Sequence, residues 1–454
     1  MIRFHVRLLG LVCLSFLLVS CKAITNQLQH SANLATREAA AVPPSNPDLE
    51  GPQMVELDRY HAPPHQKNLA IAVAASGGGY RAANLLIGVL LGLEKIKDGS
   101  GHNLLQAVNY YSTVSGGGFG VGYYITQMRN YSLRHPNSLA AFSLNQSVSS
   151  MLAQDSLGMI QPNPLRADLS DLLFFGADRG QVLEEKFNKT LLATPRGGLK
   201  LGDIFIPIDQ PRKAQLPLWV TNSTIYQNAA IFPFTPDVLA RYQVINYFHN
   251  QTMTAVSGDI QDENYASEVP VAVGLTASAS VPVAITPTTL VSTACKGGGE
   301  CYLQLYDGGL ADNLGIYTAL SLLLQDNSPI KVLIIVDAYT GEVSPFSDSL
   351  SPPENVPLVR RILTTVTDAS HENLQTKIYT VGRDLLCQNG ARRVLVVRFN
   401  LRDFPEAQKV NTNLNLLDLK TQRFLIAVGE KLVQDHPELI KIFTHPESLK
   451  NDRC

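Results

Sequence analysis

The chain of 454 residues lacks the charge pattern of a nucleic-acid-binding protein. It carries 37 basic and 39 acidic side chains, for a net charge of -2, and its basic residues form no block. Nucleic acid binding and electrostatic docking on anionic lipid both depend on clustered positive charge, so neither is expected. The Cys and His residues also lack the spacing of a metal site, and no metal is expected.

A membrane-spanning length of apolar sequence is missing at the N-terminus. Residues 8–19 form an apolar run of about twelve residues, which is short for a spanning helix and follows a basic start. The run ends in Leu-Val-Ser-Cys at 18–21, which resembles the lipobox of bacterial lipoproteins. We therefore expect a signal peptide at 1–20, cleavage before Cys21 and lipidation of Cys21. The alternative is a plain secretory signal or anchor, with Cys21 incidental.

This lipobox implies an exported protein, lipid-anchored to a bacterial membrane, and to the outer membrane if the cell is Gram-negative. Exported proteins meet oxidising conditions, so two disulfides are possible among four further cysteines. These are Cys295, Cys301, Cys387 and Cys454. Cys295 and Cys301 bracket a glycine-rich loop and can close locally, in which case Cys387 can pair with Cys454. The alternative is four free thiols.

The rest of the chain divides by composition. Residues 21–68 are polar and interrupted by proline, as expected of a flexible tether that follows the lipidated cysteine. A folded body is expected at 69–440, with a less regular insertion at about 131–268. Residues 441–454 are expected to form a C-terminal tail.

The body begins with two repeats of one pattern. An apolar strand at 69–75 leads into Ser-Gly-Gly-Gly and a helix at 81–96, and a strand at 110–114 leads into a second Ser-Gly-Gly-Gly and a helix at 116–128. This alternation predicts an α/β fold with a parallel sheet. Further strands are expected at 216–221, 242–247, 302–306, 331–336 and 394–399, and further helices at 182–192, 271–280, 313–324 and 416–433.

The second glycine motif has the features of a nucleophile elbow. Ser115 lies between a strand and a helix, and Gly117 supplies the small residue that such a bent turn needs two positions later. Thr113 stands two positions before, where glycine is usual. The N-terminus of the following helix and the N–H of Gly116 can stabilise an oxyanion near Ser115.

The first glycine motif suits anion binding. Consecutive N–H groups at Gly77, Gly78 and Gly79 can point in one direction at the start of a helix. Arg81 adds a fixed charge that matches a phosphate or an oxyanion. No Gly-Lys-Ser/Thr and no third spaced glycine completes a nucleotide-binding fingerprint. Asp307, at the end of a strand and before two glycines, can act as a base if a dry site raises its pKa.

These motifs, in this order, resemble the patatin-like phospholipases, including the cytosolic phospholipase A class. The resemblance is carried by Ser-Gly-Gly-Gly-Tyr-Arg-Ala at 76–82, Ser-Gly-Gly at 115–117 and Asp-Gly-Gly at 307–309. Ala-Ser-Ala-Ser-Val-Pro at 277–282 and Asp-Asn-Leu-Gly at 312–315 add to it, so that it spans roughly residues 69–320.

The resemblance implies a three-layer α/β/α fold with a mostly parallel central sheet and a Ser-Asp dyad. Ser115 is then the nucleophile and Asp307 its partner, with no catalytic histidine, metal or other cofactor. The oxyanion hole is assigned to Gly77, Gly78, Gly79, Arg81 and Gly116. The implied activity is hydrolysis of the carboxylic esters of glycerophospholipids or lysophospholipids through an acyl-enzyme.

Three alternatives remain open. A Ser-His-Asp esterase of the α/β-hydrolase type could use Ser115, Asp337 and His371 in that order. A catalytically silent lipoprotein could use the fold for lipid binding, a reading that Thr113 favours. Ser76, with Ala74 before it and Gly78 after it, could replace Ser115 as the nucleophile.

Overall fold

The structure is a computed structural model of the whole chain. It describes residues 49, 51–61, 63, 68–136, 139–153, 179–211, 216–249, 253–254, 266–282, 284–295, 298–340, 387–388, 391–392, 394–410 and 417–446. The expected signal peptide, Cys21, His371 and Cys454 lie outside these residues, and nothing is described of the Cys387 side chain. Within the described ranges, no helix is long and apolar enough to cross a membrane.

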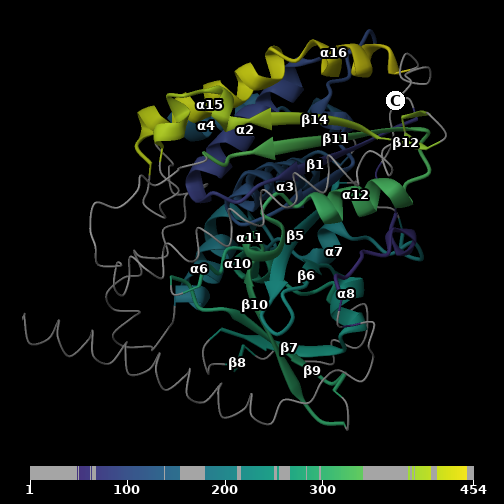
Figure 1. Cartoon of the computed structure of the whole chain (residues 1–454), viewed down its shortest axis with the longest axis vertical. Helices are drawn as coiled ribbons and strands as arrows, with labels where there is room; N and C mark the ends of the chain where they lie inside the picture. The colour runs from purple at the N-terminus through teal and green to yellow at the C-terminus, as the bar shows by residue number, and fades with distance from the viewer. Residues whose placement is uncertain are drawn as a thin grey trace, which may run out of the picture.

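A ten-stranded sheet forms the centre of the molecule (Figure 1). Its parallel part runs in the order β14 (Leu395–Asn400), β11 (Ile330–Asp337), β1 (Leu69–Ala75), β2 (Tyr110–Thr113) and β5 (Leu218–Ile225). All residues of β1, β2 and β5 are buried, as expected of strands that are covered on both faces.

The sheet continues beyond β5 with antiparallel strands. Two of them overlap the strands expected at 302–306 and 242–247, but their antiparallel direction was not predicted. The antiparallel strands are β10 (Cys301–Asp307), β9 (Thr288–Ser292), β7 (Val244–Phe248) and β8 (Met253–Thr254), while β6 (Ile231–Phe234) pairs with β5. Two small hairpins, β3 (Ala193–Thr194) with β4 (Gly197–Gly198) and β12 (Cys387–Gln388) with β13 (Ala391–Arg392), stand apart.

Helices cover both faces of the parallel part. In Figure 1, α12 (Ile316–Gln325) crosses in front of the sheet and α3 (Gly116–Arg134) lies behind it. Helix α2 (Gly79–Lys95) packs between α3 and α15 (Leu419–Gln434). The remaining helices are α4 (Leu144–Ala153), α6 (Arg179–Lys186), α7 (Leu201–Ile204), α8 (Pro236–Arg241), α10 (Val271–Ser278), α11 (Gly309–Asp312) and α16 (Pro437–Thr444). The α/β fold class predicted from the sequence is confirmed.

Two expected boundaries need correction. The segment 131–268 is not a separate insertion, because it supplies β5, which pairs with β2 inside the sheet. The C-terminal tail does not begin at 441, because α16 continues to Thr444 and buries Ile442 and Phe443. Both errors arise because the partners that bury these segments are distant in sequence.

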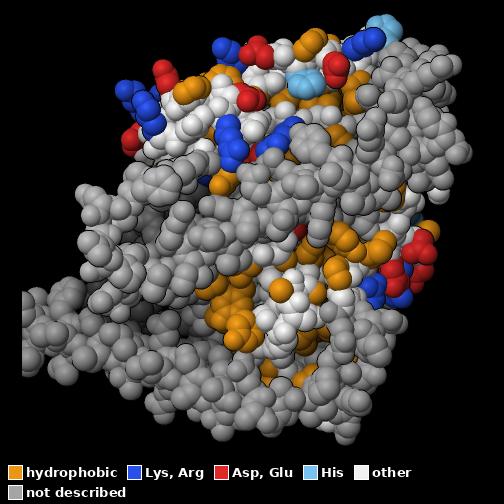
Figure 2. Space-filling model, viewed as in Figure 1, with side chains coloured by type: hydrophobic (Ala, Val, Ile, Leu, Met, Phe, Trp, Pro, Cys, Tyr) orange, Lys and Arg blue, Asp and Glu red, His pale blue; other side chains and the backbone are white. Residues whose placement is uncertain are grey.

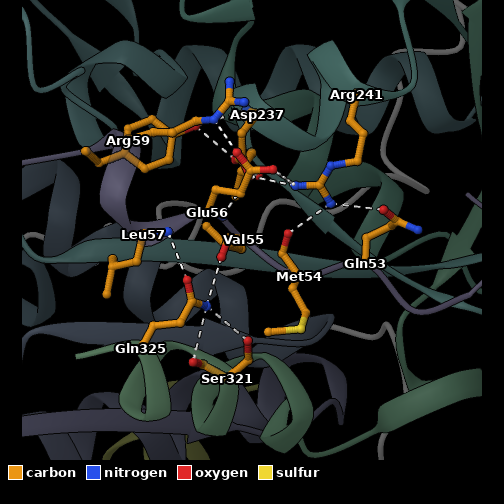
Figure 3. Close-up of polar contacts among 12 residues, drawn as sticks. Gln53, Met54, Val55, Glu56, Leu57, Arg59, Asp237, Arg241, Ser321 and Gln325 are labelled. Atoms are coloured by element: carbon orange, nitrogen blue, oxygen red, sulfur yellow. Dashed lines mark hydrogen bonds and ion pairs between the residues drawn. The ribbon is translucent and has the colours of Figure 1, made fainter. Parts of the chain in front are cut away.

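The tether also ends earlier than expected. Residues 51–61 form a strap that packs on the body, and Figure 3 shows its polar contacts. The Gln325 side chain accepts a hydrogen bond from the Leu57 N–H at 3.1 Å, and Arg241 of α8 pairs with Glu56 at 2.7 Å. Leu49, just before the strap, and the strap residues Val55, Leu57 and Tyr60 are buried. The strap therefore belongs to the folded body.

The strap gives a stability prediction. The Tyr60 hydroxyl, buried in the fold, donates to the Asp237 carboxylate at 2.9 Å and accepts from the Asp237 N–H at 2.9 Å. We expect Tyr60→Phe to lower the free energy of unfolding by about 2 kcal/mol, because both Asp237 groups lose a buried partner. Denaturant unfolding of Tyr60→Phe and of Tyr226→Phe measures this, since Tyr226 is 60% exposed and its variant is expected to match the wild type. Equal midpoints for the two variants would contradict the assignment.

A disulfide joins Cys295 and Cys301, whose Cα atoms are 5.9 Å apart. It lies where the chain passes from β9 to β10, at the far end of β10 from Asp307. It therefore ties the antiparallel strands together and is remote from the glycine motifs.

Candidate active site

The sheet register brings Ser115 and Asp307 to the same level. Strand β2 ends at Thr113, opposite Thr221 of β5, whereas β5 continues for four more residues. Asp307, the last residue of β10, lies opposite Ser223, two residues further along β5. Strand β6 occupies the other edge of β5 at these positions, so β2 and β10 share one edge. Ser115, two residues beyond Thr113, therefore meets Asp307.

Ser115 has the backbone of a strained strand-to-helix turn. Its φ of 48° and ψ of -124° are unusual for a residue with a side chain, and α3 begins at the next residue. A Cβ atom on Gly116 would lie 2.0 Å from the Gly79 carbonyl oxygen. Only glycine fits at this position, because the two glycine motifs of the sequence are in direct backbone contact.

Asp307 is buried beside the nucleophile candidate. Its carboxylate accepts a hydrogen bond from the Gly309 N–H at 2.8 Å, and the Ser115 hydroxyl lies close enough to interact with it. Burial raises the pKa of Asp307 to about 6, and the interactions with the Gly309 N–H and the Ser115 hydroxyl partly oppose the shift. A carboxylate with this pKa is ionised at neutral pH and is a stronger base than an exposed aspartate.

The first glycine turn differs from the expected oxyanion hole at one residue. The Gly77 N–H donates to the Asn313 carbonyl at 3.0 Å, so this donor is used inside the fold. The N–H groups of Gly78, Gly79 and Gly116 have no hydrogen-bond partner among the described residues. The expected role of Gly77 is therefore corrected to a structural one, which the sequence could not reveal because Asn313 is distant along the chain.

Asn313, which accepts the Gly77 N–H, belongs to the Asp-Asn-Leu-Gly motif at 312–315. The buried Asp312 carboxylate accepts from the N–H groups of Leu314, Gly315 and Tyr317 at 2.9–3.0 Å, which caps the start of α12. Burial raises the pKa of Asp312, and these N–H groups oppose the shift. The capped turn presents the carbonyl of Asn313 to the first glycine motif.

Arg81 lies beside the glycine turn. Its guanidinium is buried and donates to the Val410 carbonyl at 2.7 Å. A Cβ atom on Gly78 would lie 3.6 Å from the second terminal nitrogen of Arg81. The positive charge of Arg81 therefore lies beside the first glycine turn, where the N–H groups of Gly78 and Gly79 remain available.

The alternative site residues have other contacts. The Ser76 hydroxyl donates to the Gly77 carbonyl at 3.0 Å and accepts from the Ala338 N–H at 2.8 Å, which joins the ends of β1 and β11. Asp337 forms an ion pair with Arg398 of the neighbouring strand. Ser76 and Asp337 thus both hold strand ends together.

Sequence reasoning missed the residues that support Ser115. Thr113, which stands where glycine is usual, accepts a hydrogen bond from the Trp219 indole N–H at 2.9 Å. Asn222 donates to the Thr113 carbonyl at 3.1 Å, and Ser278 accepts from the Ser115 N–H at 2.9 Å. Ser278 lies in a motif that the sequence did single out, but Asn222 carried no signal because its segment was interpreted as an insertion.

The described residues contain no group of three or more His, Cys, Asp and Glu side chains arranged to hold a metal ion. The site consists instead of a serine, a buried carboxylate and backbone N–H groups. This set can carry out nucleophilic attack, proton transfer and oxyanion stabilisation.

No protein-family model matches the chain, and no curated protein matches it in sequence. Among solved structures, the chain is similar to human GIVD cytosolic phospholipase A2 in complex with methyl gamma-linolenyl fluorophosphonate inhibitor and terbium chloride. The TM-score is 0.40 and the sequence identity is 12%, and the match covers 84% of this chain and 60% of that chain. A second complex, with the fluorophosphonate, gives a TM-score of 0.40 and 14% identity over 83% and 59%. A third structure of the human protein gives 0.36 and 12% over 82% and 59%. The chain thus spans about 60% of the length of the structures it resembles.

Proposed function

We propose that the protein is a serine acyl hydrolase that cleaves carboxylic esters of glycerophospholipids or lysophospholipids with a Ser115–Asp307 dyad. The observation that carries the proposal is Ser115 itself, with the backbone of a nucleophile elbow and its side chain beside the buried carboxyl group of Asp307. The order of the motifs, which resembles that of patatin-like phospholipases, supports the same reading.

In the proposed reaction the Ser115 oxygen attacks the ester carbonyl while Asp307 accepts the hydroxyl proton. The N–H groups of Gly78, Gly79 and Gly116 donate to the oxyanion, and Asp307 then gives the proton to the leaving alcohol. Water then attacks the acyl-enzyme while Asp307 accepts its proton, and the bond between the acyl group and the Ser115 oxygen breaks. Asp307 returns the proton to the Ser115 oxygen, and the fatty acid is released. Acylation and deacylation of Ser115, each with a lower barrier, thus replace the direct attack of water on the ester.

Surface character supports a lipid substrate. In Figure 2, hydrophobic side chains gather over the part of the molecule where Figure 1 shows α10, α11 and β10, whereas many charged side chains gather over α15 and α16. Tyr226, which is 60% exposed, follows β5, and its ring contacts that of Tyr306, the residue before Asp307. Tyr317, which is 37% exposed, is the second residue of α12. Arg81 supplies a positive charge for a substrate phosphate. We further propose that lipidation of Cys21 holds the enzyme at a bacterial membrane.

Product analysis tests the proposal. Purified wild-type protein and Ser115→Ala are incubated with mixed glycerophospholipids, and the products are resolved by mass spectrometry. We expect free fatty acid and lysolipid from the wild type alone. Neither product from the wild type, or equal amounts from both proteins, would refute the proposal.

The pKa of Asp307 predicts the pH dependence of the reaction. Because Asp307 must be ionised to accept a proton and its pKa is raised to about 6, the rate rises with pH through that value and then levels off. At pH 4 we expect roughly one hundredth of the plateau rate. A profile of kcat/KM between pH 4 and 8 measures this, on a soluble ester that does not titrate there. A midpoint near the pKa of an exposed aspartate would contradict the assignment.

A further inference from the structure

Ser278, the last residue of α10, contacts Ser115 and the residue that follows Asp307. Its hydroxyl accepts a hydrogen bond from the Ser115 N–H at 2.9 Å. Its carbonyl oxygen accepts from the Gly308 N–H at 3.3 Å, directly after Asp307. The side chain is buried, so water does not compete for these contacts. One residue therefore links the nucleophile turn to the base turn.

The single hydroxyl proton of Ser278 has a defined direction. It is donated to the Asn222 carbonyl at 2.6 Å, so a lone pair must face the Ser115 N–H. Asn222 is held in turn by its side chain, which donates to the Ser112 hydroxyl at 2.9 Å and accepts from the Thr318 hydroxyl at 2.6 Å. The orientation of Ser278 is thus determined by buried groups from β2, β5 and α12.

This contact matters because of the backbone of Ser115. A residue at φ 48° and ψ -124° remains in that conformation only when its surroundings impose it. The bond to Ser278 restrains the peptide N–H of Ser115 itself. It also occupies that N–H, which leaves the Gly116 N–H as the donor of the elbow for an oxyanion.

We propose that Ser278 is a positioning residue that sets the separation of Ser115 and Asp307, with its hydroxyl holding the first and its carbonyl holding the turn after the second. The proposal rests on the proposed function. It requires that Ser278 contact neither substrate nor the transferred proton. Its loss therefore lowers the reactivity of Ser115 without changing the chemistry of Asp307.

Ser278→Ala removes the hydroxyl and leaves the Ser115 N–H without this acceptor. We expect the rate of Ser115 labelling by a fluorophosphonate probe to fall about 10- to 100-fold, because small misplacements of reacting groups cost this much. The pH midpoint of labelling is expected to remain that of the wild type, since the bonds to the Asp307 carboxylate are retained. Ser278→Cys, with a sulfur that accepts only weakly, is expected to lie between the wild type and Ser278→Ala.

Ser280→Ala is the matched control. Ser280 is a buried serine two residues away, and its hydroxyl donates to the Thr276 carbonyl at 2.8 Å. Labelling rates and thermal midpoints are measured for the wild type and all three variants. We expect Ser280→Ala to label at the wild-type rate.

The outcomes separate the two proposals. Absence of Ser115 labelling in the wild type overturns the proposed function. If the wild type is labelled, and the labelling rates of Ser278→Ala and Ser280→Ala are reduced equally or not at all, only the positioning role of Ser278 is overturned. If Ser278→Ala does not fold, Ser278→Cys decides the question by the same comparison.

Discussion

Ser115→Ala is expected to abolish ester hydrolysis and covalent labelling by fluorophosphonate probes. Loss of the attacking oxygen removes the acyl-enzyme path, and a deficit on the order of 10⁴- to 10⁶-fold in kcat is the usual consequence of removing a serine nucleophile. The fold should survive, because the change removes one oxygen at a helix start and the N–H of residue 115 keeps its bond to Ser278. Rates on a chromogenic ester and intact-protein mass spectrometry measure the two effects.

Ser76→Ala is the control for this result. Its hydroxyl joins the ends of β1 and β11, so the variant tests a structural serine in the companion motif. Labelling of Ser76→Ala at the peptide that contains Ser115 is expected. A probe adduct on Ser76 in the wild type would instead assign attack to the first motif.

Asp307→Asn is expected to reduce kcat/KM by about 10³- to 10⁴-fold, because an amide cannot accept the serine proton. The variant also separates the dyad from the Ser-His-Asp alternative. His371→Ala is its counterpart, and we expect it to retain activity. Activity that survived Asp307→Asn and disappeared in His371→Ala would overturn the dyad.

Although Asp307→Asn is expected to lower activity, it should increase the stability of the fold at neutral and alkaline pH. The pKa of Asp307 is about 6 in the fold and 3.8 for a free side chain, so the folded state binds a proton more tightly than the unfolded state. Stability due to this group is therefore present at low pH and is lost as pH rises from about 4 to above 6. At pH 8, Asp307→Asn should be more stable than the wild type by up to about 3 kcal/mol. Denaturant unfolding at pH 8 and pH 4 measures the difference, which is expected to fall to about 0.5 kcal/mol at pH 4.

The parallel core was predictable because its signals are local. An apolar run that ends in glycine and then turns helical identifies β1 with α2 and β2 with α3. Their bounds lie within two residues of those expected, except that α3 continues six residues beyond 128 to Arg134. Other elements were less clear. The helix expected at 313–324 begins only at Ile316, as α12, because Gly315 adopts a left-handed conformation with φ 67°. Strands β6 and β9 and helix α16 were missed, since their burial depends on distant partners.

The sequence by itself determined which groups are available for chemistry: a serine at a strand-to-helix turn, a glycine nest with an arginine, and an aspartate at a strand end. Tertiary structure alone decided how they are used. It assigned the Gly77 N–H to Asn313 and placed β5 so that Ser115 and Asp307 lie side by side. It also bonded the Ser115 N–H to Ser278, which is 163 positions away in the sequence. The physical reason is that a hydrogen bond between distant residues leaves no periodic pattern in sequence, whereas a strand, a turn and a helix start each do.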